Sequence, residues 1–175
     1  MEIFEATNEG RNGAVLSSCK TYRYRLDRWW SDGDCVVWVM LNPSTADAST
    51  DDQTIRKCVG FSKLWGYGRL IVVNLFALRS TDPAVLARST DACGVQNDCY
   101  IAQAMESAAE VIVAWGCQQH MSTEKLKRRP TQLLEFVRTL RPDVEISCLG
   151  YRKDGAPRHP VILPYSTQRQ PWLFS

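Results

Sequence analysis

The chain has 175 residues, of which 45% are hydrophobic and 23% are charged, and its net charge is +2. This composition is ordinary for a globular protein and excludes a disordered chain. No apolar run reaches the roughly 20 residues that a membrane-spanning helix needs, and a domain dedicated to duplex DNA is often far more basic. We therefore expect one domain over residues 1–175, without a membrane partner and, because its N-terminus has no signal-peptide pattern, in the cytoplasm.

The seven cysteines are scattered along the sequence, and no two of them form a C-x-x-C pair. A zinc or iron–sulfur site usually contains at least one such close pair. Only His120 and His159 are available for a histidine-rich centre. We expect reduced thiols that act as small hydrophobic residues, with no metal and no cofactor.

The chain divides into an N-terminal segment, a core and a tail. Residues 1–34 show partial alternation of apolar and polar positions and predict a hairpin or edge strand packed on the core. Four apolar runs of strand length follow, over residues 36–41, 69–76, 110–116 and 144–150. Residues with helical spacing lie between them, over 54–66, 95–109 and 131–140, the last starting after Pro130. Residues 165–175 form the tail.

This alternation predicts an α/β fold, a three-layer α/β/α sandwich around a central, mainly parallel four-stranded sheet in residues 35–164. Ligands of such sheets bind outside the carboxyl ends of the strands. The polar and aromatic residues that follow those ends are therefore candidates for a site: Asn42, Pro43, Ser44, Thr45, Asn74, Phe76, Trp115, Gly116, and Lys153, Arg158 and His159 in the last loop.

Asn74 is notable because an amide at the end of an apolar strand must have its donors and acceptor satisfied. Its side chain either bonds to neighbouring backbone or presents two donors and one acceptor to the edge of a ligand. His159 lies beside Arg158, which disfavours the charged imidazolium, and a neutral imidazole can still donate to a developing anion. Phe76 and Trp115 are either core residues or a stacking wall.

Two charged clusters also have two interpretations. Asp47, Asp51 and Asp52 either cap the following helix and its loop or hold Mg²⁺; the sequence favours capping. The basic run over residues 125–129 is either a solvated helix face, which is favoured, or a phosphate contact.

Several segments between Leu41 and Pro160 resemble a family of bacterial and phage proteins known as the domain-of-unknown-function 1643 family. These segments are LNPSTADA, DD-x-TI, WGYG, VVNLFALR-x-TDP, GVQND, VAWG and KDG-x-PRHP. More distantly, the chain is similar to the uracil-DNA glycosylase superfamily, in particular its mismatch-specific branch. The matching elements are Asn42-Pro43 after the first central strand, the strand ending in Trp115-Gly116, His159-Pro160, and a loose R-P-T counterpart at Leu78 to Thr81, which includes Arg79.

The second resemblance implies a uracil-DNA glycosylase-like sandwich and hydrolysis of an N-glycosidic bond in a nucleic acid or nucleotide, in DNA repair or a phage-related process. Asn42 would position water and His159 would donate to the leaving base. The other candidate residues named above, among them Pro43, Asn74 and Arg158, would bind a nucleotide, a modified base or a single-stranded nucleic acid. The protein would be a monomer or a weak homodimer. Met40, Ser44 and Val161-Ile162 depart from the superfamily pattern. One alternative is a protein that binds a nucleotide or modified base without catalysis, and another is an interaction protein with a vestigial site.

Overall fold

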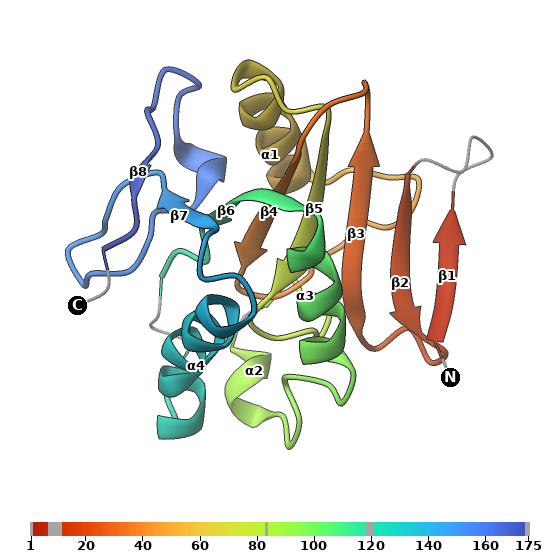
Figure 1. Cartoon of the computed structure of the whole chain (residues 1–175). Helices are drawn as coiled ribbons and strands as arrows, with labels where there is room; N and C mark the ends of the chain where they lie inside the picture. The colour runs from red at the N-terminus through yellow and green to blue at the C-terminus, as the bar shows by residue number, and fades with distance from the viewer. Residues whose placement is uncertain (1, 7–11, 83, 118–120, 174–175) are drawn as a thin grey trace.

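The computed structural model describes residues 2–6, 12–82, 84–117 and 121–173 (Figure 1). Its strands lie in one sheet, with the order β1-β2-β3-β5-β4-β6-β7-β8. The strands are β1 (Glu2–Ala6), β2 (Gly13–Ser17), β3 (Arg23–Trp29), β4 (Cys35–Met40), β5 (Arg69–Asn74), β6 (Ala108–Val113), β7 (Glu145–Cys148) and β8 (Gln170–Pro171). The helices are α1 (Gln53–Leu64), α2 (Val85–Arg88), α3 (Asn97–Glu106), α4 (Glu124–Leu140) and the 3-10 helix η1 (Pro160–Ile162).

The predicted α/β class is confirmed, but the sheet is larger than the expected four strands. Neighbours β5, β4, β6 and β7 pair in parallel. Strands β1, β2 and β3 pair antiparallel to one another, and β3 pairs antiparallel to β5. On the opposite edge, β8 pairs antiparallel to β7. The segments expected as a hairpin and a tail thus extend the central sheet through backbone hydrogen bonds.

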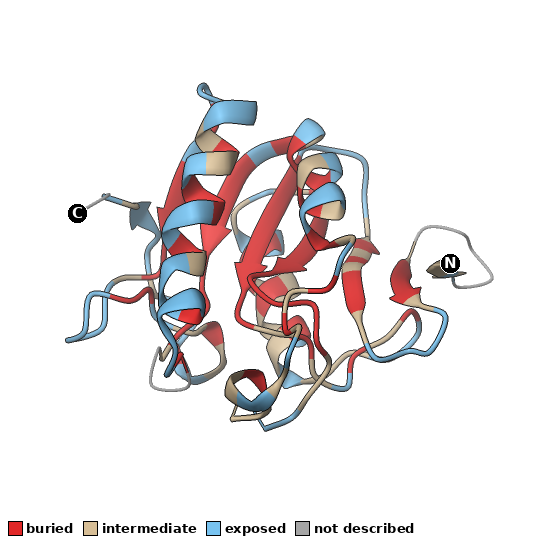
Figure 2. Cartoon of the chain, turned by 90° about the horizontal axis from the view of Figure 1, so that it is seen from below, coloured by how far each residue is buried: buried red, intermediate tan, exposed pale blue. Residues whose placement is uncertain are grey.

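Helices cover both faces of the sheet (Figure 1). On one face, alternate side chains of the central strands pack with residues of α2, α3 and α4. On the other face, Val36, Trp38 and Val72 pack with Ile55 and Phe61 of α1. The central strands are consequently buried along their length, as Figure 2 shows. A sheet covered on both faces explains why these strands are continuous apolar runs.

Helix α4 begins earlier than predicted. The expected helix starts after Pro130, whereas the structure has Pro130 inside α4. The hydroxyl of Thr123 caps the helix by accepting from the N–H of Leu126, and burial of Leu126, Leu133, Leu134 and Val137 holds the helix on the sheet. The basic run forms its first turns, where Lys125, Lys127 and Arg128 are exposed.

Within the described ranges, no helix is long and apolar enough to cross a membrane.

The connections leave β4 and β6 in opposite directions. Strand β4 continues through α1 to β5 on one side, whereas β6 continues through α4 to β7 on the other. In open α/β sheets such a change of direction opens a crevice at the carboxyl ends of the two strands, where ligands bind. The site is therefore expected between the residues that follow Met40 and Val113.

Candidate functional site

A pocket of about 340 Å³ opens at this crevice. Its volume lies within the range of pockets that bind small ligands. It is bordered by the ends of β4, β5 and β6, the start of β3, the start of α1, and the loop before η1. The lining residues are Arg23, Met40, Leu41, Asn42, Ser44, Asp52, Thr54, Ile55, Val72, Asn74, Ser80, Thr81, Trp115, Gly116, Cys117, Arg152, His159, Val161 and Ile162.

Asn42 is held in a fixed orientation at the end of β4. Its Nδ2 donates to the carbonyl oxygens of Ser80 at 2.9 Å and Pro43 at 3.1 Å, with Leu78 O at 3.5 Å. Carbonyl oxygens only accept hydrogen bonds, so these partners fix the amide nitrogen on their side. The Oδ1 atom receives no hydrogen bond from the described residues and is available to a ligand or water in the pocket.

Asn74 is the least satisfied polar side chain of the pocket. It is 1% exposed, and neither its Nδ2 nor its Oδ1 has a hydrogen-bond partner among the described residues. The neighbouring amide of Asn97 is also buried, but its Nδ2 donates to the carbonyl oxygen of Asn74 at 3.0 Å. A buried group without a partner costs about 1–3 kcal/mol. Because neither atom of the Asn74 amide has a partner, the interpretation in which Asn74 bonds to neighbouring backbone is excluded for the described residues.

His159 presents a donor to the pocket. Its Nδ1 accepts from the backbone N–H of Val161 at 3.3 Å, so the proton of the neutral ring is on Nε2. Burial lowers the pKa of His159 from its ordinary value, an effect only partly opposed by Asp52. The imidazole is consequently neutral at pH 7, with Nε2–H as its donor. Gly116 lies against this ring: its φ is +75°, and an added Cβ would lie 2.9 Å from the Cβ of His159.

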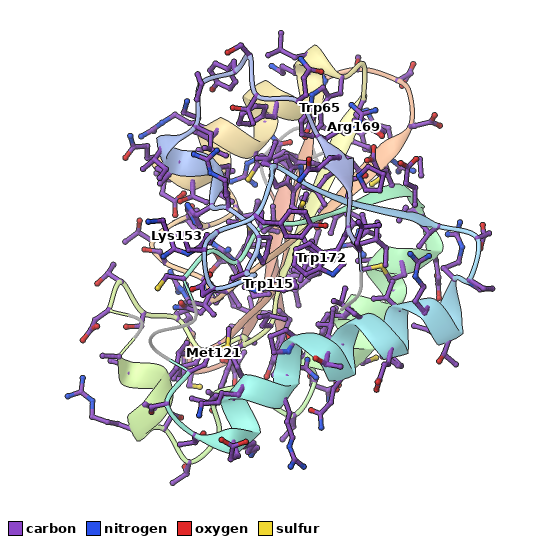
Figure 3. The ribbon with its side chains drawn as sticks, turned by 90° about the vertical axis from the view of Figure 1, so that its left-hand side faces the viewer. Trp65, Trp115, Met121, Lys153, Arg169 and Trp172 are labelled. Carbon is purple, nitrogen blue, oxygen red and sulfur yellow. The ribbon has the colours of Figure 1, made fainter. Side chains whose placement is uncertain are left out.

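Trp115 connects the pocket to the C-terminal segment. Its side chain is 2% exposed, and its ring centroid lies 5.7 Å from that of Trp172, in an edge-on arrangement. Figure 3 shows these two tryptophans next to each other, and Arg169 beside Trp65. The Arg169 guanidinium lies 4.9 Å from the Trp65 ring centroid. The chain after His159 thus returns to the edge of the sheet, where β8 pairs with β7, and is anchored there by aromatic contacts.

The structure brings together half of the residues predicted from the sequence. The residues that line the pocket are Asn42, Ser44, Asn74, Trp115, Gly116 and His159. The other six lie outside it: Pro43 is buried below the loop, Thr45 is exposed, Phe76 belongs to the core on the α3 and α4 face, the Arg79 guanidinium donates to Lys20 O, and Lys153 and Arg158 are exposed. His120 is outside the described residues.

Several residues that line the pocket are not among those predicted from the sequence. Ser80 and Thr81 belong to the loop that Asn42 holds, and they, rather than Arg79, reach the pocket. Arg152 is one residue from the predicted Lys153, in the same loop. Arg23 comes from the N-terminal segment, and no signal in the sequence separates it from Arg25 and Arg28 of the same strand, which do not line the pocket.

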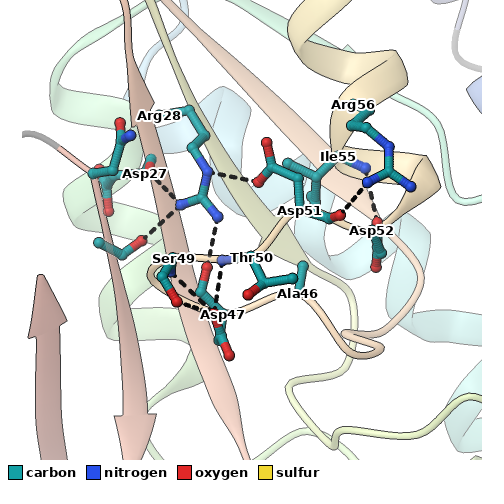
Figure 4. A network of polar contacts seen from close by, with 12 residues as sticks. Asp27, Arg28, Ala46, Asp47, Ser49, Thr50, Asp51, Asp52, Ile55 and Arg56 are labelled. Atoms are coloured by element: carbon teal, nitrogen blue, oxygen red, sulfur yellow. Dashed lines mark hydrogen bonds and ion pairs between the residues drawn. The ribbon is translucent and has the colours of Figure 1, made fainter. Parts of the chain in front are cut away.

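The three carboxylates of the acidic cluster have protein partners in the structure. Asp47 accepts from Ser49 and Thr50 in its own loop, Asp51 pairs with Arg28 at 2.7 Å, and Asp52 caps α1 by accepting from the N–H of Ile55 at 2.9 Å (Figure 4). These contacts agree with capping and loop bonding rather than with Mg²⁺. No group of three histidine, cysteine or acidic side chains in the described part of the chain is arranged to hold a metal ion.

The fold and the pocket define an α/β protein with a pocket of small-ligand size at the change of strand direction. The chain belongs to the family described as protein of unknown function (DUF1643), whose model matches residues 23–161. This range includes every residue that lines the pocket except Ile162. No curated protein and no solved structure gives a significant match. The similarity to the uracil-DNA glycosylase superfamily therefore stays a prediction.

Proposed function

We propose that the pocket binds a nucleobase and that the protein hydrolyses the N-glycosidic bond of a nucleotide or single-stranded nucleic acid. The observation that carries this proposal is the buried, unpartnered amide of Asn74 in one pocket with Asn42 and His159. An amide offers neighbouring donors and an acceptor, which match the N–H and carbonyl groups on the edge of a pyrimidine or purine. A ligand of this kind satisfies both atoms of Asn74 at once.

The reaction needs a group that orients the attacking water and a group that stabilises the departing base, and Asn42 and His159 can fill these two roles. Water adds its oxygen to the sugar carbon while the glycosidic electron pair passes to the base nitrogen, and the proton that water loses is taken up by the departing base or by solvent. Oδ1 of Asn42 accepts a hydrogen bond from that water and orients it. Nε2–H of His159 donates to a carbonyl oxygen of the base as negative charge develops there, an effect worth about 10²–10³ in rate.

The second candidate is a protein that binds the same ligand without cleaving it. The Asn42 amide cannot take up a proton as a carboxylate does, and the Asp52 carboxylate in the pocket already caps α1. Both features favour slow turnover or none. The two candidates share the ligand and differ only in release of the base.

The test is incubation of the protein with nucleosides, nucleotides and single-stranded oligonucleotides carrying normal and modified bases, followed by detection of free base by mass spectrometry. We expect base release by the wild type and a loss of at least about 100-fold in Asn42→Ala and His159→Gln. Binding without release by the wild type supports the second candidate. Neither binding nor release of any member of the panel contradicts the proposal.

Asn74→Leu is the third variant of this set. We expect it to lose ligand binding and to raise the free energy of unfolding by about 1 kcal/mol, because leucine removes two unsatisfied polar atoms from the core. Asn97→Leu is the matched control: it removes a buried amide that donates to Asn74 O, and it should lower stability. Equal destabilisation by both substitutions would contradict this prediction, because the unpartnered amide of Asn74 would then not destabilise the ligand-free protein.

A further inference from the structure

Two buried arginines of β3 have very different surroundings. Arg28 is 6% exposed and each nitrogen of its guanidinium has an acceptor: Nε donates to Asp51 Oδ1 at 2.7 Å, Nη1 to Asp27 O at 2.7 Å, and Nη2 to Asp47 O (Figure 4). It thereby holds the loop between β4 and α1 against β3. A buried cation with a carboxylate and several carbonyl acceptors is an ordinary structural arginine.

Arg23 is more deeply buried than Arg28 and has fewer partners. It is 2% exposed, its Nη1 donates to Ala46 O at 2.7 Å, and its Nε is buried without an acceptor among the described residues. No carboxylate in the described part of the chain lies within 4.0 Å of its guanidinium. Unlike Arg28, it lines the pocket.

The guanidinium of Arg23 keeps its charge in this position. Burial lowers its pKa to about 10, and the positive charges of Arg79 and Arg28 act in the same direction, whereas Asp52 and Asp47 oppose it. At pH 7 Arg23 is therefore a buried cation with no carboxylate of the described residues within ion-pair distance, and Asp52 and Asp47 act on it only from farther away. A buried charge that is not directly paired is costly, and an anionic ligand would satisfy it through charge-assisted hydrogen bonds.

We propose that Arg23 binds an oxyanion carried by the same ligand whose base contacts Asn74, which makes the substrate class anionic nucleotides or bases rather than neutral nucleosides. The proposal rests on the function proposed above and narrows it. Arg23 and Asn74 lie close together because the N–H of Arg23 donates to Ala77 O, three residues after Asn74. Both side chains line the same pocket, so one ligand can supply an anion to Arg23 and hydrogen-bond partners to the Asn74 amide.

The oxyanion has two chemical sources: a phosphate on the sugar or a carboxylate on the base. Asp52 is the negative charge of the pocket, and it stands at the start of α1, where Thr54 and Ile55 also line the cavity. Its Oδ1 accepts from the N–H of Ile55, which commits it to the helix. Arg152 also lines the pocket, but it is exposed and lies 3.5 Å from a carboxylate oxygen of Asp154. Arg23 is therefore the buried cation that is left for an anion, and Asp52 limits the space in which that anion fits.

The experiment measures dissociation constants by calorimetry for uridine, uridine 5′-monophosphate, a uracil carboxylate and inorganic phosphate. We expect the wild type to bind either the monophosphate or the carboxylate at least about tenfold more tightly than the nucleoside, and the stronger of the two identifies the source. Arg23→Gln should abolish this difference and change the affinity for uridine by less than about threefold. Arg28→Gln, the matched control from the same strand, should keep the difference.

If Arg23→Gln does not fold, the comparison of ligands on the wild-type protein decides the question. Equal affinity for uridine and both anionic ligands overturns the role of Arg23, even if base release is observed. Preference for an anionic ligand without release of its base supports Arg23 and rejects hydrolysis. Binding of inorganic phosphate alone, with no preference among the pyrimidines, also overturns the proposal because the anion is then not part of the base ligand.

Discussion

At the scale of single residues, the polar side chains of the pocket differ in which of their atoms bond within the protein and which are left for a ligand. Asn42 uses its Nδ2 on backbone carbonyls, and His159 uses its Nδ1 on the N–H of Val161. Each side chain is therefore anchored by one atom and presents the other. Asn74 has no anchor among the described residues and depends on the pocket alone. This division separates the groups that orient a ligand from the group that recognises it.

The titration of His159 predicts how stability changes with pH. Its folded pKa is lowered below the ordinary value of 6.5 by burial, so the unfolded chain binds the proton more tightly than the folded one. The contribution of the neutral ring is fully present above pH 6.5 and is lost as the pH falls below that value. We expect the urea midpoint of the wild type to fall between pH 7.5 and pH 5 by more than that of His159→Gln. Parallel curves for the two proteins contradict this prediction.

The sequence was sufficient to find Asn42, Asn74 and His159 as lining residues because Asn42 and Asn74 lie at the ends of apolar strands and His159 lies in the loop after the last of these strands. It was insufficient for Arg23 because alternation fails in β3. The register between β2 and β3 shifts: Val15 pairs with Arg25, whereas Leu16 pairs with Arg23. This bulge places an extra residue in β3, so Arg23 and Leu26 reach the α1 face of the sheet although three positions separate them. A bulge of this kind has no signature in one sequence.

At the scale of secondary-structure elements, the strand centres were predictable and the ends and extensions were not. The four apolar runs correspond to β4, β5, β6 and β7 because burial on both faces requires continuous apolar residues. β1 and β8 lie at the edges of the sheet and have no such run. The sequence predicts a shorter helix than α4 because the residue before a proline disfavours the helical conformation, so the predicted helix begins only after Pro130.

Pro130 is expected to weaken α4. It lacks the N–H that would donate to the carbonyl of Leu126, and its ring crowds that carbonyl. We expect Pro130→Ala to raise the free energy of unfolding by about 1–2 kcal/mol, less than the full helix penalty of about 3 kcal/mol because the buried ring is lost. Denaturation by urea measures the change. Thr131→Ala, at the exposed next position, is the control and should stay within about 0.5 kcal/mol.

A decrease in stability on Pro130→Ala would mean that the proline positions its neighbour. Arg129 donates from Nε to Leu75 O at 2.9 Å and pairs with Asp98 of α3. Through these bonds α4 is connected to α3 and to the segment that follows Asn74. Helix α4 therefore lies next to the end of β5, one of the strands that border the pocket.

At the scale of the whole molecule, parts of the chain that are distant in sequence meet at the pocket. Strand β3 supplies Arg23 and the loop after β7 supplies His159, while Trp172 packs against the lining residue Trp115. Lys57 of α1 donates to Leu163 O at 2.7 Å and so joins the C-terminal segment to the helix that begins at the pocket. The site is thus closed by parts of the chain that are distant in sequence.

The clearest attachment of the C-terminal segment is the ion pair between Arg169 and Glu110. Glu110 is 3% exposed in β6, pairs with Arg169 Nε at 3.1 Å, and accepts a hydrogen bond from the hydroxyl of Tyr67. Burial and this bond raise the pKa of Tyr67. Removal of Arg169 leaves a buried carboxylate without its cation, which is destabilising, although partial exposure of the arginine reduces the effect.

We therefore expect Arg169→Met to lower the free energy of unfolding by about 2 kcal/mol, and the double variant Glu110→Gln with Arg169→Met to recover more than half of that loss. Glutamine keeps the acceptor for Tyr67 but carries no charge, so the double variant separates the cost of an unpaired carboxylate from the loss of the aromatic contact to Trp65. Urea denaturation of the wild type, both single variants and the double variant gives the coupling energy. Additive effects would mean that Arg169 holds the segment through Trp65 and not through Glu110.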